Sequence, residues 1–151
     1  MKTNAVEDLV RSLYRLGMVQ RELARHALAE LGTQGFVALG AIHLDGPVRV
    51  SDVAQRLNVA LSVASRQVAA LERAGYVERE TDPEDGRAHR VSATDAGRTV
   101  LEESHRRMVN AFSRALEGWS AREITDLSES LERLREDVHR DVVDGAKGAL
   151  A

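Results

Sequence analysis

Residues 51–93 change from helical to extended hydrophobic periodicity, and this change constrains the possible folds more than any other feature. Apolar residues recur every three or four positions in "SDVAQRL" and again in the stretch that ends before Gly75, which predicts two short helices joined by about four residues. Apolar and polar residues then alternate in 76–80 and 89–93, which predicts a β-hairpin. The segment is therefore expected to be a helix-turn-helix followed by a hairpin.

The predicted ends of these elements carry residues suited to caps and turns. Ser51 stands where an N-cap is expected, and Gly75 can end the second helix in a left-handed conformation. Asp85-Gly86, a pair that tolerates positive φ, lies in a link between the strands that is longer than a tight turn. We expect this link to project as a loop.

Long helical patterns flank the middle segment. Residues 5–30 and 121–144 carry apolar stripes, and Ser120 with Glu123 forms a capping box for the second pattern. The stripes exceed what the middle segment needs for its own core, so they predict a symmetric dimer held by both terminal helices. A monomer that folds its own termini together is the alternative.

The remaining elements complete a mainly α fold. The apolar run 36–44 predicts a short buried helix, and Thr94 can cap a helix that runs to about residue 118. We expect one domain over 1–145, with a winged helix-turn-helix at 48–97 made of a three-helix core plus a β-hairpin wing. Residues 146–151 are expected to form a disordered tail.

Composition excludes several classes of function. The 151 residues include no cysteine, so disulfides, thiolate zinc sites and cysteine nucleophiles are absent from this sequence. The first residues lack a signal-peptide core, and no apolar run approaches the length of a membrane span, so we expect a cytoplasmic protein. The net charge of −3 does not indicate a nucleic-acid binder, so such a function must rest on local charge placement.

The second helix of the pair offers such a placement. With about 100° of rotation per residue, Arg66 lies opposite the apolar face formed by Leu61, Ala64, Val68 and Leu71. Ser62 and Arg73 fall within about 40° of Arg66, and Ser65 lies on the flank. Arginine can pair with guanine in the major groove, and serine can contact phosphates or base edges. Ordinary solvated positions are the alternative interpretation.

The link between the strands carries a second candidate. An arginine at the tip of a projecting hairpin, Arg87, could enter the minor groove, where the negative potential is strong. Asp85 could accept a hydrogen bond from an arginine and so hold the direction of the guanidinium. The neighbouring Asp82 and Glu84 oppose the approach of phosphate, and the sequence offers no physical account of them. A polar, unoccupied loop is the alternative.

These residues together resemble the MarR family of bacterial transcriptional regulators. The resemblance lies in "LERAGYVER", the D-x-R of Asp85 and Arg87, and the following Val91 and T-x-x-G of Thr94 and Gly97. It covers about two thirds of the chain closely. Two departures, Ala60 at the start of the second helix and Ala93 in the second strand, affect local stability and remove no expected DNA contact.

The resemblance implies a homodimer of winged helices that binds a palindromic operator as a repressor and is released by a small aromatic or anionic ligand. Ser62, Ser65 and Arg66 would lie on the recognition helix, with Arg87 at the wing tip. The ligand would bind between the dimerisation helices and the winged helix, where Tyr14, Arg15 and His43 could supply polarity. Core or solvated roles for these three residues are the alternative.

Enzymatic chemistry has little support in the sequence. The five histidines show no metal-ligand spacing of the H-E-x-x-H type, and no serine lies in a nucleophile elbow. Glu22 and His26 could share one helix face as zinc ligands, although such pairs are usually solvated. We expect no catalytic residue, metal site or cofactor. A winged-helix module for protein interaction and a small-molecule-binding protein without specific DNA binding are the rival functions.

Overall fold

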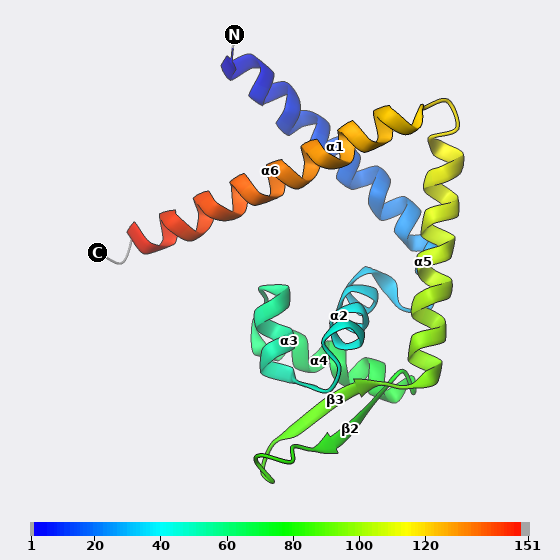
Figure 1. Ribbon diagram of the computed structural model, residues 1–151, viewed down its shortest axis with the longest axis vertical. Helices are drawn as coiled ribbons and strands as arrows, with labels where there is room; N and C mark the ends of the chain where they lie inside the picture. The colour runs from blue at the N-terminus through cyan, green and yellow to red at the C-terminus, as the bar shows by residue number, and fades with distance from the viewer. Residues whose placement is uncertain (1, 149–151) are drawn as a thin grey trace. The chain divides into compact units, whose positions relative to one another are not determined.

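The computed structural model describes residues 2–148, and Figure 1 shows its six helices and two of its strands with their labels. Around the small sheet the fold is mainly α, as predicted. The elements follow the order α1 Lys2–Ala27, α2 Gly32–Asp45, β1 Val48–Arg49, α3 Val50–Leu57, α4 Leu61–Arg73, β2 Val77–Thr81, β3 His89–Ala93, α5 Asp95–Ala115 and α6 Ala121–Gly148.

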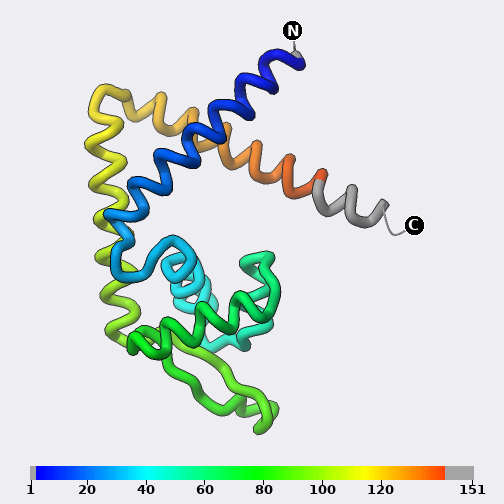
Figure 2. The backbone as a smooth tube through the Cα atoms, turned by 180° about the vertical axis from the view of Figure 1, so that it is seen from behind, coloured from blue at the N-terminus to red at the C-terminus, as the bar shows by residue number. Residues whose placement is uncertain are grey.

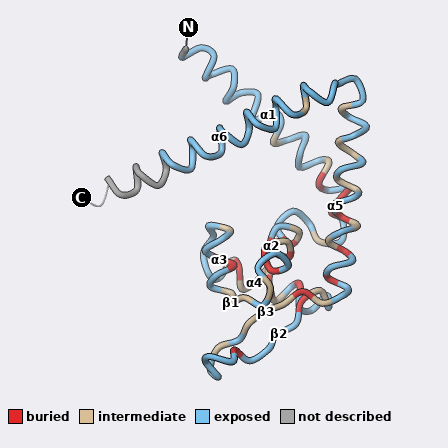
Figure 3. Tube along the Cα trace, viewed as in Figure 1, coloured by how far each residue is buried: buried red, intermediate tan, exposed pale blue. Residues whose placement is uncertain are grey.

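The predicted winged helix forms from α2, α3, α4 and a three-stranded antiparallel sheet in the order β1-β3-β2. Val48 and Arg79 both pair with Val91, and Val77 pairs with Ala93. Because side chains alternate across a strand, this register places the apolar strand residues on one face. They join a single buried core, drawn in red in Figure 3 and made of Ala38, Leu39, Ile42, Val53, Ala54, Ala64, Val68, Leu71, Val77, Val91, Ala93 and Val100.

The junction between the hairpin and α5 explains the T-x-x-G pattern. Thr94 Oγ1 accepts a hydrogen bond from the Gly97 amide at 3.0 Å and donates one to the Gly75 carbonyl at 2.7 Å. A Cβ on Gly97 would lie 2.0 Å from the carbonyl oxygen of Tyr76. The predicted cap at Thr94 is therefore confirmed, and Gly97 is required for the close approach of α5 to the end of α4.

Several predicted helix ends were wrong. The N-cap of α3 is Arg49, and Asp52 accepts the Arg49 amide at 3.2 Å, so Ser51 lies inside the helix. Asp52, the third residue of α3, thus satisfies the amide of the N-cap residue from inside the helix. Gly75, with φ of 78°, does end α4 as predicted.

The long helices also differ from their predicted bounds. α1 ends at Ala27 rather than at residue 30, and α5 ends at Ala115 rather than near 118. α6 continues to Gly148, past the predicted end at 144, where the sequence has helix-compatible Ala and Lys. Residues 149–151 of the predicted tail lie outside the described residues.

Residues 1–112 and 113–151 form two compact units. In the first unit, the end of α1 packs through Ala24, Ala27 and Leu28 with the partly buried Phe36 and Met108. The second unit begins α6 with the predicted capping box, in which Glu123 Oε2 accepts the Ser120 amide at 2.8 Å. Within the described residues, no single helix is long and apolar enough to cross a membrane, although α1 and α2 taken together across their bend meet that length and composition.

Candidate nucleic-acid interface

The recognition face predicted for α4 is exposed. Ala64, Val68 and Leu71 are buried in the core, so the helix faces the core as predicted. Ser62, Arg66 and Arg73 are exposed and Ser65 is half-buried, in agreement with the rotation per residue. Leu61 was expected in the core and is 55% exposed, because it begins the helix ahead of the residues that meet the core.

The hairpin that forms the wing extends away from the helices in both views (Figure 1, Figure 2). Its seven-residue loop, 82–88, consists of two consecutive turns. The carbonyl of Asp82 accepts the amide of Asp85 at 3.2 Å, and the carbonyl of Asp85 accepts the amide of Ala88 at 2.8 Å. Each turn is reinforced by an aspartate side chain that accepts the amide two residues on, in the manner of an Asx-turn.

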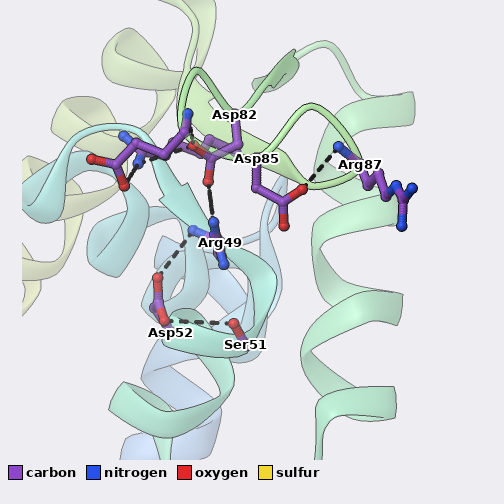
Figure 4. A network of polar contacts seen from close by, with 8 residues as sticks. Arg49, Ser51, Asp52, Asp82, Asp85 and Arg87 are labelled. Atoms are coloured by element: carbon purple, nitrogen blue, oxygen red, sulfur yellow. Dashed lines mark hydrogen bonds and ion pairs between the residues drawn. The ribbon is translucent and has the colours of Figure 1, made fainter.

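This construction corrects two expectations. Gly86 has no positive φ, so the loop does not reverse through a left-handed glycine as the Asp-Gly pair suggested. Asp85 Oδ1 accepts the backbone amide of Arg87 at 3.1 Å and does not hold the guanidinium. Figure 4 shows the Arg87 side chain extending away from that carboxylate. Asp85 therefore shapes the backbone beneath Arg87 and leaves the guanidinium free of it.

Asp82, which the sequence left unexplained, is the most buried polar side chain of the wing. Its side chain is 0% exposed and lies between two arginines (Figure 4). Arg49 Nε donates to Oδ2 at 2.7 Å, Arg49 Nη2 lies 2.7 Å from the same oxygen, and Arg90 Nη2 lies 3.1 Å from Oδ1. The Glu84 amide also donates to Oδ1, at 2.9 Å.

These contacts keep the Asp82 carboxylate ionised. The hydrogen bond from the Glu84 amide and those from Arg49 and Arg90 lower the pKa of Asp82 to about 2, against the opposing effect of burial. Glu84 has a role of its own, since its carboxylate lies 3.4 Å from Arg90. The sequence alone contained no signal for this network, because Arg49 and Arg90 become cross-strand neighbours only in the folded sheet, where the carboxylate offsets the repulsion between their like charges.

The three predicted ligand residues are exposed in the single chain, and the ligand site assigned to them stays a prediction. Tyr14 is 75% exposed, and Arg15 and His43 are also exposed, so His43 is not the buried histidine that one interpretation expected. A different, apolar cavity of about 190 Å³ lies beside α4 and contains none of these three. It is lined by Thr33, Gln34, Val37, Leu57, Val59, Val63, Ala64 and Gln67.

The suggested zinc pair is also engaged otherwise. The carboxylate of Glu22 forms an ion pair with Arg25, and His26 Nδ1 lies 3.0 Å from the Glu22 carbonyl oxygen. Among the residues that the structure describes, no three His, Cys, Asp or Glu side chains gather as a metal site would require.

Comparison with known proteins finds similarity to the MarR family. A sequence model described as the MarR family matches residues 31–88, which include α3, α4 and most of the wing. Over 89 residues the chain is 33% identical to YxaD, an uncharacterized HTH-type transcriptional regulator of Bacillus subtilis. The chain is similar to the MarR family over its winged-helix region. The match with YxaD covers 59% of this chain and 62% of the relative's own length.

Solved structures of MarR proteins share the fold. A MarR family protein from Bacillus stearothermophilus superposes with a TM-score of 0.80 at 23% identity, covering 92% of this chain and 99% of that one. A mutant MarR from E. coli, solved in complex with operator DNA, has a TM-score of 0.73 at 22% identity over 87% of this chain and 96% of its own. The winged helix-turn-helix architecture and the long flanking helices are thus those of MarR structures.

Proposed function

We propose that this protein is a cytoplasmic transcriptional regulator of the MarR family that binds a specific double-stranded DNA sequence and carries out no catalysis. The observation that carries the proposal is the pairing of the eight arginines in residues 49–98. Five of them form ion pairs with carboxylates: Arg49, Arg56, Arg79, Arg90 and Arg98. Within the described residues, the three without an ion pair are Arg66, Arg73 and Arg87.

This division of the arginines into paired and unpaired groups answers the objection that the segment has no net positive charge. The eight arginines of 49–98 are balanced by eight acidic residues, so the segment has no net charge. The carboxylates nevertheless pair with the arginines that hold the fold together. The arginines on the exposed face of α4 and at the wing tip remain available to bind DNA. A phosphate or base edge would then meet uncompensated guanidinium groups. Ser62 and Ser65 add hydroxyls to the same face of α4.

The terminal helices support a homodimer. Val6, Leu9, Leu13 and Leu16 of α1 are each 38% to 50% exposed, and α6 exposes Leu127, Leu131 and Val138 to 41% to 54%. Such stripes lie on a monomer surface only at a cost, and a second copy can cover them. A two-fold dimer would present two α4 helices to a palindromic operator, with half-sites about one helical turn apart.

We further propose repression that is relieved by a small aromatic or anionic compound. The cavity beside α4 has a volume of about 190 Å³, comparable to an apolar cavity of about 150 Å³ that accepts benzene. Val63, Ala64 and Gln67 of α4 line it, so an occupant would touch the flank of the helix that presents Arg66. A ligand that favours a dimer with displaced α4 helices would weaken operator binding by that preference.

The test begins with selection of bound sequences from the organism's own genomic fragments, with and without phenolic and anionic compounds. With the selected sequence, Arg87→Ala should weaken binding about tenfold and reduce the salt slope by about 1. Arg66→Ala should relax the base preference at one position per half-site. Arg122→Ala, on the fully exposed surface of α6, is the matched control and should change neither quantity.

Three results would contradict the proposal. Unchanged operator affinity of Arg87→Ala at fixed salt removes the wing assignment, and an unchanged selection profile removes Arg66 from base reading. Failure to select any sequence, together with binding that does not depend on salt, favours the rival functions of protein interaction or small-molecule binding.

A further inference from the structure

We infer that Asp82 is a positioning residue for the wing, which fixes the 82–88 loop on the sheet and so sets the direction in which Arg87 meets DNA. The inference rests on the proposed DNA binding and deepens it, because Asp82 itself is buried and would touch no DNA. Its role would be exercised through the backbone of the loop and through the arginines that it holds.

Three segments converge on the Asp82 carboxylate. Arg49 reaches it from the end of β1, Arg90 from β3, and the amide of Glu84 from within the loop. Arg49 is also the N-cap of α3, where Asp52 accepts its amide. Asp82 thus ties the wing to the first residue of the helix-turn-helix, and charge-assisted bonds of this kind fix direction as well as distance.

The path from Asp82 to Arg87 is short and continuous. The amide of Asp82 donates to the Ala88 carbonyl at 2.9 Å, and its carbonyl accepts the amide of Asp85. Asp85 in turn accepts the amide of Arg87. Asp82 therefore begins the first turn, and Asp85, where that turn ends, begins the second turn, which carries Arg87. A change in the orientation of Asp82 would move the backbone at the tip.

Polar contacts are the main restraint on this loop. Residues 83–87 are all exposed, so none of them anchors the loop in the apolar core. Without the carboxylate, the loop would keep its backbone bonds and the contact between Glu84 and Arg90, but it would lose its attachment to Arg49 and its closest contact with Arg90. Those two arginines would also lose their buried partner, which makes the network costly to break.

A double-mutant cycle on the selected DNA tests the inference. Asp82→Asn keeps the shape of the side chain and removes its charge, and should weaken binding about tenfold. In that background Arg87→Ala should cost at most about twofold, compared with about tenfold in the wild type, because Arg87 is already misdirected. Arg66→Ala on α4 is the control, and its effect should be the same in both backgrounds.

Two further measurements keep the outcome clear. Amide exchange of Glu84 and Arg87 without DNA should quicken in Asp82→Asn, and unchanged exchange overturns the inference whatever the DNA result. If Asp82→Asn does not fold, Arg49→Lys, which keeps the charge but loses the two-nitrogen contact, takes its place in the cycle. Losses from Asp82→Asn and Arg87→Ala that simply multiply also overturn it. Failure of the wild-type protein to bind any DNA would instead defeat the proposed function, before a variant is made.

Discussion

The winged-helix region buries its apolar residues, whereas the terminal helices expose theirs. Leu39, Ile42 and Val91 are completely buried in the core of the first, whereas Leu9 and Leu13 of α1 are 43% and 38% exposed. Both regions carry helical stripes of similar residue types. The difference shows that the core of the winged helix is complete within one chain, while the terminal helices leave apolar side chains exposed. The proposed dimer would cover that surface.

The ion pairs of the two regions also differ. In the winged region, carboxylates bridge separate elements, as in the pairs between Arg79 of β2 and Glu72 of α4 or between Arg56 of α3 and Asp45 of α2. On α6 the ion pairs join residues at most four apart along one helix, as between Arg135 and Glu132. Local pairs of this kind support a helix but do not fix its position against anything else.

The largest expected effect comes from Gly97→Ala in the winged region. A methyl group 2.0 Å from the Tyr76 carbonyl oxygen must push α5 away from the end of α4. We expect the free energy of unfolding to fall by about 3 kcal/mol, as measured by urea denaturation. Gly86→Ala in the wing loop, where the new Cβ meets nothing within 4 Å, is the control and should change little. Equal stability of the two variants would show that the close approach is not maintained in solution.

Negative charge placed on the apolar stripe of α1 should weaken the association of the terminal helices. Leu9→Glu combined with Leu13→Glu is expected to raise the dimer dissociation constant at least about 100-fold, because each buried leucine contributes about 1.5–3 kcal/mol. Sedimentation equilibrium measures the change. The winged region should still fold, and its unfolding transition should remain. Asn4→Glu, about 180° around the helix from Leu13, adds one negative charge away from the stripe as a control. A protein that is monomeric before any substitution would contradict the dimer.

The core of the winged helix could be predicted because periodicity determines it directly. Ala64, Val68 and Leu71 turn inward since they share one face of α4, and the alternation of Val91 and Ala93 fixes the inner face of the sheet. Thr94 was likewise found by its position before a helix. Such features depend on a few neighbouring residues and on the geometry of a single element.

The Asp82 network could not be predicted in the same way, because it depends on the register of three strands and the turns between them. Asp82, Arg49 and Arg90 are far apart in the sequence, and only the paired sheet makes them neighbours. The free guanidinium of Arg87 was expected to be held by Asp85, since an i, i+2 pair does not reveal whether the backbone or the side chain is the donor. His43 interrupts an apolar run, yet its face of α2 is exposed.

The smallest expected effect is a gain in the stability of the winged region alone, from a new cap at the start of α4. Ala60 is the N-cap of α4 with φ of −62° and ψ of 145°, an extended conformation ready for a capping side chain, and it makes no such bond. In Ala60→Ser the hydroxyl can accept the amide of Ser62 or Val63, so the free energy of unfolding should rise by about 1 kcal/mol in urea denaturation.

Ser51→Ala is the matched control for this prediction. Its hydroxyl lies 3.5 Å from Asp52 within α3 and caps nothing, so the substitution should leave stability within about 0.5 kcal/mol of the wild type. A loss near 1 kcal/mol would restore Ser51 as the cap of α3. The dimer dissociation constant should stay the same in both variants, because neither residue lies on the terminal helices. A shift in that constant with Ala60→Ser would show that the stability of the winged region and the association of the terminal helices are coupled.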